Sequence, residues 1–186
     1  RLSVEEEREG DFELLEKAGS EKGFEVERAQ TLEFEGERIS SSRVRESLAN
    51  GDFELAKALM GRPYSIMGRV VYGRQLGRQL GVPTANVRLQ RYRSALEGVY
   101  SVSVDGLDVG RKNGIANIGI RPTVGGKEPL LEVHLFDFSG DIYGHLISVT
   151  FHQKIRDEQQ FASIELLKAQ IEKDIVQSQD WFVSNA

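Results

Sequence analysis

The residues with the clearest chemical potential lie in a glycine-rich segment that ends in Pro-Thr-Ala-Asn. Its glycines, Gly73, Gly77 and Gly81, allow the backbone to approach a ligand closely and to present N–H groups to phosphate oxygens. Their spacing matches neither the Walker pattern nor the dinucleotide fingerprint. On the glycines alone, a surface loop without a ligand is the favoured interpretation, and a phosphate cradle is the alternative.

Thr84 and Asn86 make a phosphate site more specific. They stand two residues apart on an extended segment, so their side chains point to the same face. A hydroxyl and an amide carbonyl are hard oxygen ligands suited to Mg²⁺, which binds few protein groups and shares phosphate oxygens. The alternative is a turn in which both side chains only satisfy backbone groups.

Glu132 is the candidate general base. In the alternating stretch LLEVHLFDF it lies on the opposite face from Leu131 and Val133. A carboxylate in a strand of a small barrel could point into a ligand cavity and accept a proton there. From the residues alone, a strand carboxylate that faces solvent is the favoured alternative. The three histidines have no metal-binding spacing, and we expect them to be structural.

Composition and charge limit the classes of function. The net charge of −5 argues weakly against a protein that mainly binds nucleic acid. Residues 68–93 nevertheless carry six arginines and no acid, which indicates either a small anionic ligand or scattered solvated side chains. Without cysteine, disulfides and thiolate metal sites are excluded. No apolar run approaches the roughly 20 residues of a membrane span, so we expect a cytoplasmic protein with no membrane partner.

The elements that must position these residues change in character along the chain. From Tyr64 onward, six short β-branched or alternating runs are separated by glycine-containing turns, which predicts an antiparallel barrel or sandwich. A helix capped by Ser163 should follow, with Phe161, Ile164, Leu167, Ile171 and Ile175 on its inward face. Upstream we predict helices over 11–23, 39–51 (entered at Ser41 or Ser42) and 52–63 (capped by Asp52), and a strand over 24–34.

Together these segments resemble the riboflavin kinase family. GRVVYGRQLGRQLGVPTANV is similar to its nucleotide loop, whose signature is a glycine-rich loop ending in Pro-Thr-Ala-Asn. GVYSVSV, GIANIGIRPTVGG, LEVHLFDFSGDIYG and FHQKIRDEQQFASIELLKAQIEKD resemble its later segments in the same order. The resemblance runs from about Pro63 to the C-terminus. It implies a mainly β fold, a six-stranded antiparallel Greek-key barrel with a C-terminal helix.

The resemblance also implies a reaction and roles for single residues. ATP and riboflavin would give FMN and ADP, with Mg²⁺ as the cofactor. Glu132 would deprotonate the ribityl 5′-hydroxyl, and Thr84 and Asn86 would hold the metal. The implied binding residues are Gly73, Gly77, Arg78, Gly81, Thr84 and Asn86 for ATP, and Arg156, Glu158 and Phe161 for the flavin.

The upstream segment ISSSRVRESLANGDFELAKALMGRPY resembles the junction in bacterial bifunctional FAD synthetases. There the motif Ile-Ser-Ser-Thr-x-x-Arg contacts ATP phosphates, and here Ser42 and Arg45 stand at its threonine and arginine. The resemblance implies that residues 1–60 are a remnant of an FMN adenylyltransferase domain and that residues 61–186 form the kinase domain. No histidine precedes His134, so the early HxGH-type motif is absent, and we expect this chain to form FMN but not FAD.

Two other functions remain open from the sequence. One is a non-catalytic module that binds a flavin or a nucleotide, which a coupled ADP assay with riboflavin would distinguish from a kinase. The other is an oligonucleotide-binding barrel, which would show steep salt dependence and would need stacking aromatics among the arginines, where only Tyr72 and Tyr92 stand. We rank it last. The oligomeric state is open, and a monomer is the simplest case.

Overall fold

The computed structural model describes residues 12–27, 30–73, 81–89, 94–123 and 126–185. By contacts between residues the chain divides into two compact units, Arg1–Ile39 and Ser40–Ala186. This division falls earlier than the domain boundary expected at residues 60–61, because the two helices that follow Ser40 pack with the barrel. The separate origin of residues 1–60 stays a prediction.

The first unit contains a helix and a short hairpin. Helix α1 (Phe12–Lys22) lies where the sequence predicts one, and β1 (Glu33–Phe34) pairs with β2 (Glu37–Arg38). Among the described residues of the strand expected over 24–34, the prediction was wrong except at the last two. After α1 the chain turns back, so that a Cβ on Gly19 would contact the Phe24 carbonyl and the Val26 side chain. These residues therefore pack on the helix instead of pairing with a strand.

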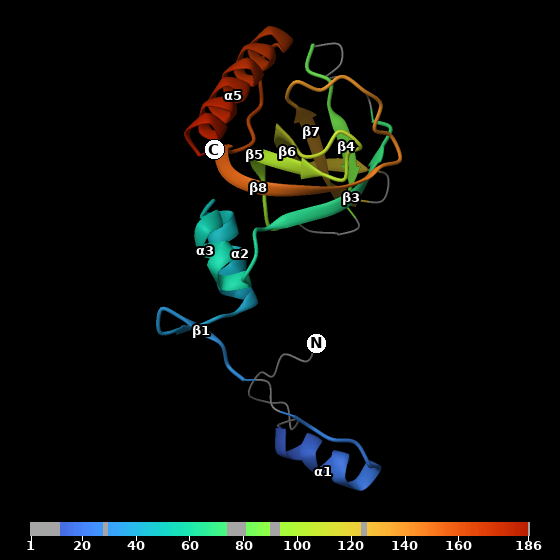
Figure 1. The fold of residues 1–186 in the computed structure, drawn as a ribbon, viewed down its shortest axis with the longest axis vertical. Helices are drawn as coiled ribbons and strands as arrows, with labels where there is room; N and C mark the ends of the chain where they lie inside the picture. Colours follow the sequence, from blue (N-terminus) through green and yellow to red (C-terminus); the bar gives the residue numbers. More distant parts are fainter. Residues whose placement is uncertain (1–11, 28–29, 74–80, 90–93, 124–125, 186) are drawn as a thin grey trace. The chain divides into compact units, whose positions relative to one another are not determined.

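The second unit is built on the expected six strands, which close into an antiparallel barrel (Figure 1). Their order around the barrel is β3-β4-β7-β6-β5-β8. Every neighbouring pair is antiparallel, which confirms the prediction from the alternating runs. The strands are β3 (Ser65–Val71), β4 (Ala85–Arg88), β5 (Gly98–Asp105), β6 (Lys112–Thr123), β7 (Gly126–Leu135) and β8 (Leu146–Arg156).

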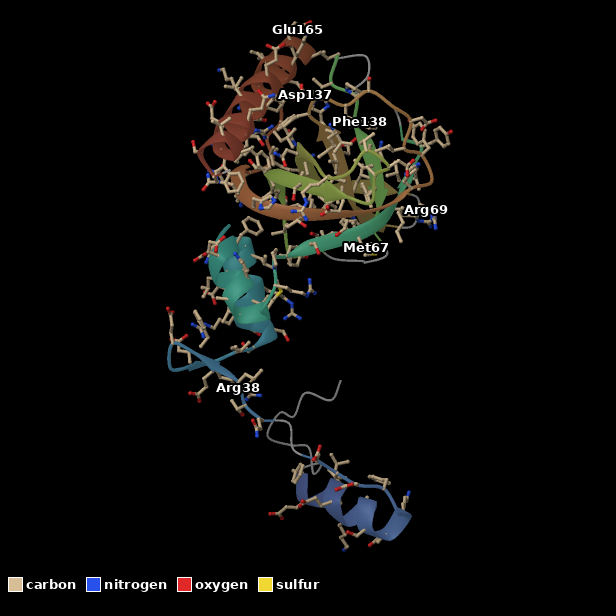
Figure 2. The ribbon with its side chains drawn as sticks, viewed as in Figure 1. Arg38, Met67, Arg69, Asp137, Phe138 and Glu165 are labelled. Atoms are coloured by element: carbon tan, nitrogen blue, oxygen red, sulfur yellow. The ribbon has the colours of Figure 1, made fainter. Side chains whose placement is uncertain are left out.

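Apolar side chains occupy the interior of the barrel. The largest are Tyr100 and Phe151, whose rings meet edge-to-face at 5.5 Å. The Tyr100 hydroxyl donates to the Glu97 carbonyl at 2.7 Å, and burial raises the pKa of this tyrosine to about 12. Alternate residues point outward, as Met67 and Arg69 do on β3 (Figure 2). Because apolar side chains fill the interior, the polar side chains of the strands lie on the outer face of the barrel.

Helices α2 (Ser41–Ala49) and α3 (Phe53–Met60) complete the core of the barrel. Leu48, Phe53 and Ala56 belong to the same buried cluster as the inward residues of the strands. Phe53 lies 5.8 Å from the Tyr100 ring. Asp52 caps α3 as predicted, whereas the cap of α2 is Ser40 and not Ser41 or Ser42, because the Ser40 hydroxyl is the one that accepts from the Arg43 N–H.

Helix α5 (Ile164–Ser184) lies against the outer face of β5 and β6 (Figure 1). The predicted Ser163 cap is confirmed. Ile175 and Phe182, in the C-terminal half of α5, pack on an apolar cluster of the barrel surface. The expected burial of Ile164 was wrong, since it is 60% exposed in a first turn that lies beyond this cluster. In the part of the chain that the structure describes, no helix could cross a membrane.

His152 lies beneath the end of α5. Its Nε2 is 2.8 Å from the Ser103 hydroxyl, and its ring stacks on Trp181 at 5.3 Å. Burial lowers the pKa of His152. The nearby cations Arg111 and Lys57 act in the same direction, and Glu54 opposes them. The unfolded chain therefore binds a proton more readily than the folded chain does.

We expect stability to fall as the pH drops below about 6.5, the ordinary pKa of histidine. Below that pH, the unfolded chain binds a proton at His152 that the folded chain does not bind, and this favours unfolding. The free energy of unfolding is therefore highest above about pH 6.5 and falls as the pH drops below it. The fluorescence of Trp181, the chain's single tryptophan, reports thermal unfolding between pH 5.5 and 7.5. His152→Gln should flatten the dependence of the midpoint on pH. An identical slope in that variant would exclude His152 as its source.

Candidate functional site

Three polar side chains meet on the outer face of the barrel. In the register of the strands, Asn86 on β4 is opposite Glu132 on β7, and Glu132 is opposite Asn117 on β6. Directly opposed residues point to the same face, with Cβ atoms about 4.5–5.5 Å apart. Asn86 is 4% exposed, and the other two are half-buried. This polar row (Asn86, Glu132, Asn117) places a carboxylate between two amides.

The polar row borders a cavity of about 280 Å³ between the barrel and α5, here called the helix cavity. This volume is close to the lower end of the range of roughly 300–1,000 Å³ for small-molecule sites. Glu132 and Asn117 supply polar groups, and apolar side chains of the barrel and of α5 supply most of the remaining wall. The three residues expected to bind a flavin, Arg156, Glu158 and Phe161, all line this cavity together with Glu132.

Arg156 ties the end of β8 to α5. Its Nε and Nη2 both lie 2.8 Å from the Asp174 carboxylate, and Nη1 donates to the Asp157 carbonyl. Gln170 donates to the other oxygen of Asp174 at 2.8 Å. The Asp174 side chain is 3% exposed and that of Arg156 is 15% exposed. The guanidinium is therefore held in the cavity wall by a buried, charge-assisted contact.

The segment that enters β4 is fixed on the same face. His134 Nδ1 lies 2.9 Å from the Pro83 carbonyl. Because a carbonyl oxygen only accepts, Nδ1 carries the proton of this hydrogen bond. The next residue, Thr84, lines the helix cavity. This contact sets the predicted threonine beside the polar row.

Close approach of the backbone explains one of the predicted glycines. A Cβ on Gly73 would overlap the side-chain amide of Asn86, so a larger residue could not stand over the polar row. Gly81 has φ +81, the left-handed conformation that favours glycine. Gly77 and Arg78, expected to bind ATP, lie outside the described residues.

A second cavity of about 550 Å³ lies on the other side of Thr84, here called the loop cavity. It is lined by inward-facing residues of β3, β4 and β7 and by the segment 138–143, which includes Asp141 and Tyr143. Tyr72, which precedes the glycine-rich segment, stacks on Tyr143 with ring centroids 3.8 Å apart. Thr84 lines both cavities. Analysis of the sequence missed this cavity, because its walls come from segments far apart in the chain.

The donor set determines which metal the site could accept. Among the described residues, no group of three or more His, Asp or Glu is placed to hold a metal ion. Near the polar row the available ligands are the Thr84 hydroxyl, the Asn86 amide oxygen and the Glu132 carboxylate. Mg²⁺ typically takes one or two protein ligands and completes its shell with water and phosphate oxygens. The residues therefore fit Mg²⁺ shared with a phosphate, and not a metal cage made by the protein alone.

Two site residues were not anticipated from the sequence. Asn117 has a weak signal, as a polar residue at an outward position of the run GIANIGI. Asp174 lies three residues after Ile171, on the face of the helix that meets the barrel. An acid on an apolar helical face is a signal for a buried ion pair. Neither partner, Glu132 or Arg156, could be identified without the register and the packing of α5.

Known proteins resemble the chain over most of its length. Residues 60–182 match the family model described as riboflavin kinase. A bifunctional riboflavin kinase/FMN adenylyltransferase from Pseudomonas fluorescens is 56% identical over 90% of this chain and 54% of its own length. One from Escherichia coli (strain K12) is 51% identical over 94% and 56%. A solved structure described as a macrolide-efflux protein from Streptococcus pneumoniae is 36% identical, with a TM-score of 0.68, over 77% of this chain and 47% of that chain. The chain thus spans about half the length of the curated relatives it matches.

The buried ion pair in the cavity wall should contribute strongly to stability. Asp174→Ala leaves the Arg156 guanidinium buried without its carboxylate, and we expect a loss of about 3–5 kcal/mol in the free energy of unfolding. Urea denaturation measures it. The control is Asp105→Ala, which breaks the exposed Arg111–Asp105 pair and should cost less than about 1 kcal/mol. Equal losses in the two variants would contradict a structural role for the Arg156–Asp174 pair.

Proposed function

Since the chain belongs to the riboflavin kinase family, we propose that it transfers the γ-phosphate of ATP to the ribityl 5′-hydroxyl of riboflavin. The products are FMN and ADP. The observation that carries this proposal is the position of Glu132, which borders a cavity suited to a flat, largely apolar ligand. A second cavity begins at Thr84, beside the carboxylate. Two substrates bound in the two cavities would meet near the polar row.

The chemistry of the walls supports one assignment of the substrates. The loop cavity is bordered by Val70 and Pro83, which flank the glycine-rich segment, so it suits the nucleotide, whose phosphates that segment would receive. The helix cavity combines apolar side chains with Phe161 and with polar groups near Glu132. It suits the flavin, with the isoalloxazine ring beside Phe161 and the ribityl chain directed to the polar row.

Glu132 accepts the proton of the 5′-hydroxyl in this mechanism. The hydroxyl oxygen forms a bond to the γ-phosphorus, the bond from that phosphorus to the β–γ bridging oxygen breaks, and ADP leaves with the electron pair. Asn86 and Asn117 flank the carboxylate in the strand register, and their amides would orient it. Positioning and charge neutralisation supply most of the rate in phosphoryl transfer, and the base supports them.

Thr84 and Asn86 are the proposed protein ligands for Mg²⁺. When bound, the metal neutralises charge on the phosphates of ATP. Thr84 lines both cavities, and Gly73 allows the backbone to pass closely over Asn86. The ATP-binding roles of Gly77, Arg78 and Gly81 and the flavin-binding roles of Arg156, Glu158 and Phe161 stay predictions.

Glu132→Gln should separate binding from turnover. The amide keeps the shape of the side chain but cannot take the proton, so we expect kcat to fall about 100-fold or more. Riboflavin and ATP should bind nearly as tightly as to the wild type. Product formation is followed by chromatography of FMN, and riboflavin binding by quenching of flavin fluorescence. Glu172→Gln, a change on the exposed side of α5, is the matched control. Unchanged turnover in Glu132→Gln would exclude Glu132 as the base.

Thr84→Ala should weaken the use of magnesium. Loss of a contact to a charged group costs about 1.5 kcal/mol, so the Mg²⁺ concentration for half-maximal rate should rise roughly tenfold. Thr84→Ser keeps the hydroxyl and should have the wild-type dependence of the rate on Mg²⁺. Asn86→Ala should act in the same direction. Wild-type dependence on Mg²⁺ and ATP in both alanine variants would contradict the proposed ligands.

A further inference from the structure

The corner between α2 and α3 lies outside the matched kinase residues but contacts the barrel closely. The N–H groups of Gly51 and Asp52 donate to the carbonyls of Leu48 and Ser47, the pattern that ends a helix at a left-handed glycine. Gly51 has φ +77. Asp52 then caps α3. The corner is therefore a fixed turn, with both of its helices anchored in the core of the barrel.

Lys154, near the end of β8, lies directly on this corner. A Cβ on Gly51 would be 3.0 Å from the Lys154 Cβ and 3.4 Å from its Cδ. The stem of the lysine thus occupies the space that a side chain at Gly51 would need. Its ammonium is 2.6 Å from the Asp157 carboxylate. A single side chain links the α2–α3 corner to the segment that follows β8.

That segment forms one wall of the helix cavity. Glu158, Gln159 and Phe161 all line it, and the Glu158 side chain covers Gly119 so closely that a Cβ there would overlap its carboxylate. On the side toward α2 lies an open space of about 420 Å³, which is lined by Ala49, Lys154 and residues 94–97 and 157–158. The start of this wall packs on Gly98, and Arg156 donates to the Asp157 carbonyl. Lys154 is the contact that connects it to the α2–α3 corner.

We propose that the α2–α3 corner positions the flavin-binding wall of the helix cavity, with Lys154 as the positioning residue. The inference rests on the proposed riboflavin kinase function. Lys154 touches neither substrate in this account. Asp157 is exposed, so the ion pair is of the kind that contributes modestly. The expected effect is a change of a few-fold in riboflavin affinity.

A matched pair of glycine variants tests the contact. Gly51→Ala and Gly61→Ala each place a side chain at a left-handed position after a helix, with φ +77 and φ +68. They therefore introduce similar backbone strain. A Cβ on Gly51 presses on Lys154, whereas a Cβ on Gly61 meets nothing within 4 Å. We expect the KM for riboflavin to rise about threefold only in Gly51→Ala, with kcat and the KM for ATP unchanged in both. Equal effects on the KM for riboflavin in the two variants would overturn the proposal.

Lys154 variants test the link without changing a turn. Lys154→Met keeps an apolar stem on Gly51 and removes the charge, and it should raise the KM for riboflavin about threefold. Lys154→Arg keeps the charge and should restore the wild-type value. Amide hydrogen exchange over residues 157–161 should be faster in Lys154→Met than in the wild type. Unchanged exchange and KM in this variant would overturn the proposal. A wild-type chain that neither binds nor phosphorylates riboflavin would overturn the proposed function instead. Hydrogen exchange would still test whether Lys154 holds the segment after β8 in place.

Discussion

The filled interior of the six-stranded barrel is the constraint on which the rest of the structure depends. In a small closed barrel the inward side chains leave no room for a substrate, and here Tyr100, Phe151 and the aliphatic residues around them take that space. Alternation then sends every second residue to the outer face. A ligand site must therefore lie outside this filled core. The helix cavity lies on the outer face, where α5 and the segment after β8 cover it, and the loop cavity lies where inward residues of β3, β4 and β7 meet the segment 138–143.

The register of the strands then selects which outward residues meet. Glu132 lies opposite both Asn86 and Asn117, and a shift of one residue would turn the carboxylate into the core. Thr84 reaches the same place because His134 holds the preceding carbonyl. On the covering side, the buried contact between Arg156 and Asp174 fixes α5. Interactions that stabilise the fold thus also set the geometry of the cavity.

The alternating runs and caps predict much of this fold. All six strands, the Ser163 cap and the outward position of Glu132 follow from local pattern. The expected strand over 24–34 failed because strand formation needs a partner, which a local pattern does not supply. Asn117 and Asp174 could not be assigned, since their roles depend on pairing across strands and on how a helix packs. The same limit applies to the α2–α3 corner, whose contact with Lys154 joins residues about one hundred positions apart.

One measurement tests the central claim most directly. The complete chain is incubated with riboflavin, ATP and Mg²⁺, and FMN and ADP are quantified by chromatography over time. If the helix cavity and the loop cavity bring a flavin hydroxyl and the γ-phosphate together at Glu132, FMN and ADP appear in equal amounts at a steady rate that depends on Mg²⁺. A folded chain that binds both substrates yet forms no FMN, or that releases ADP without FMN, would contradict the account.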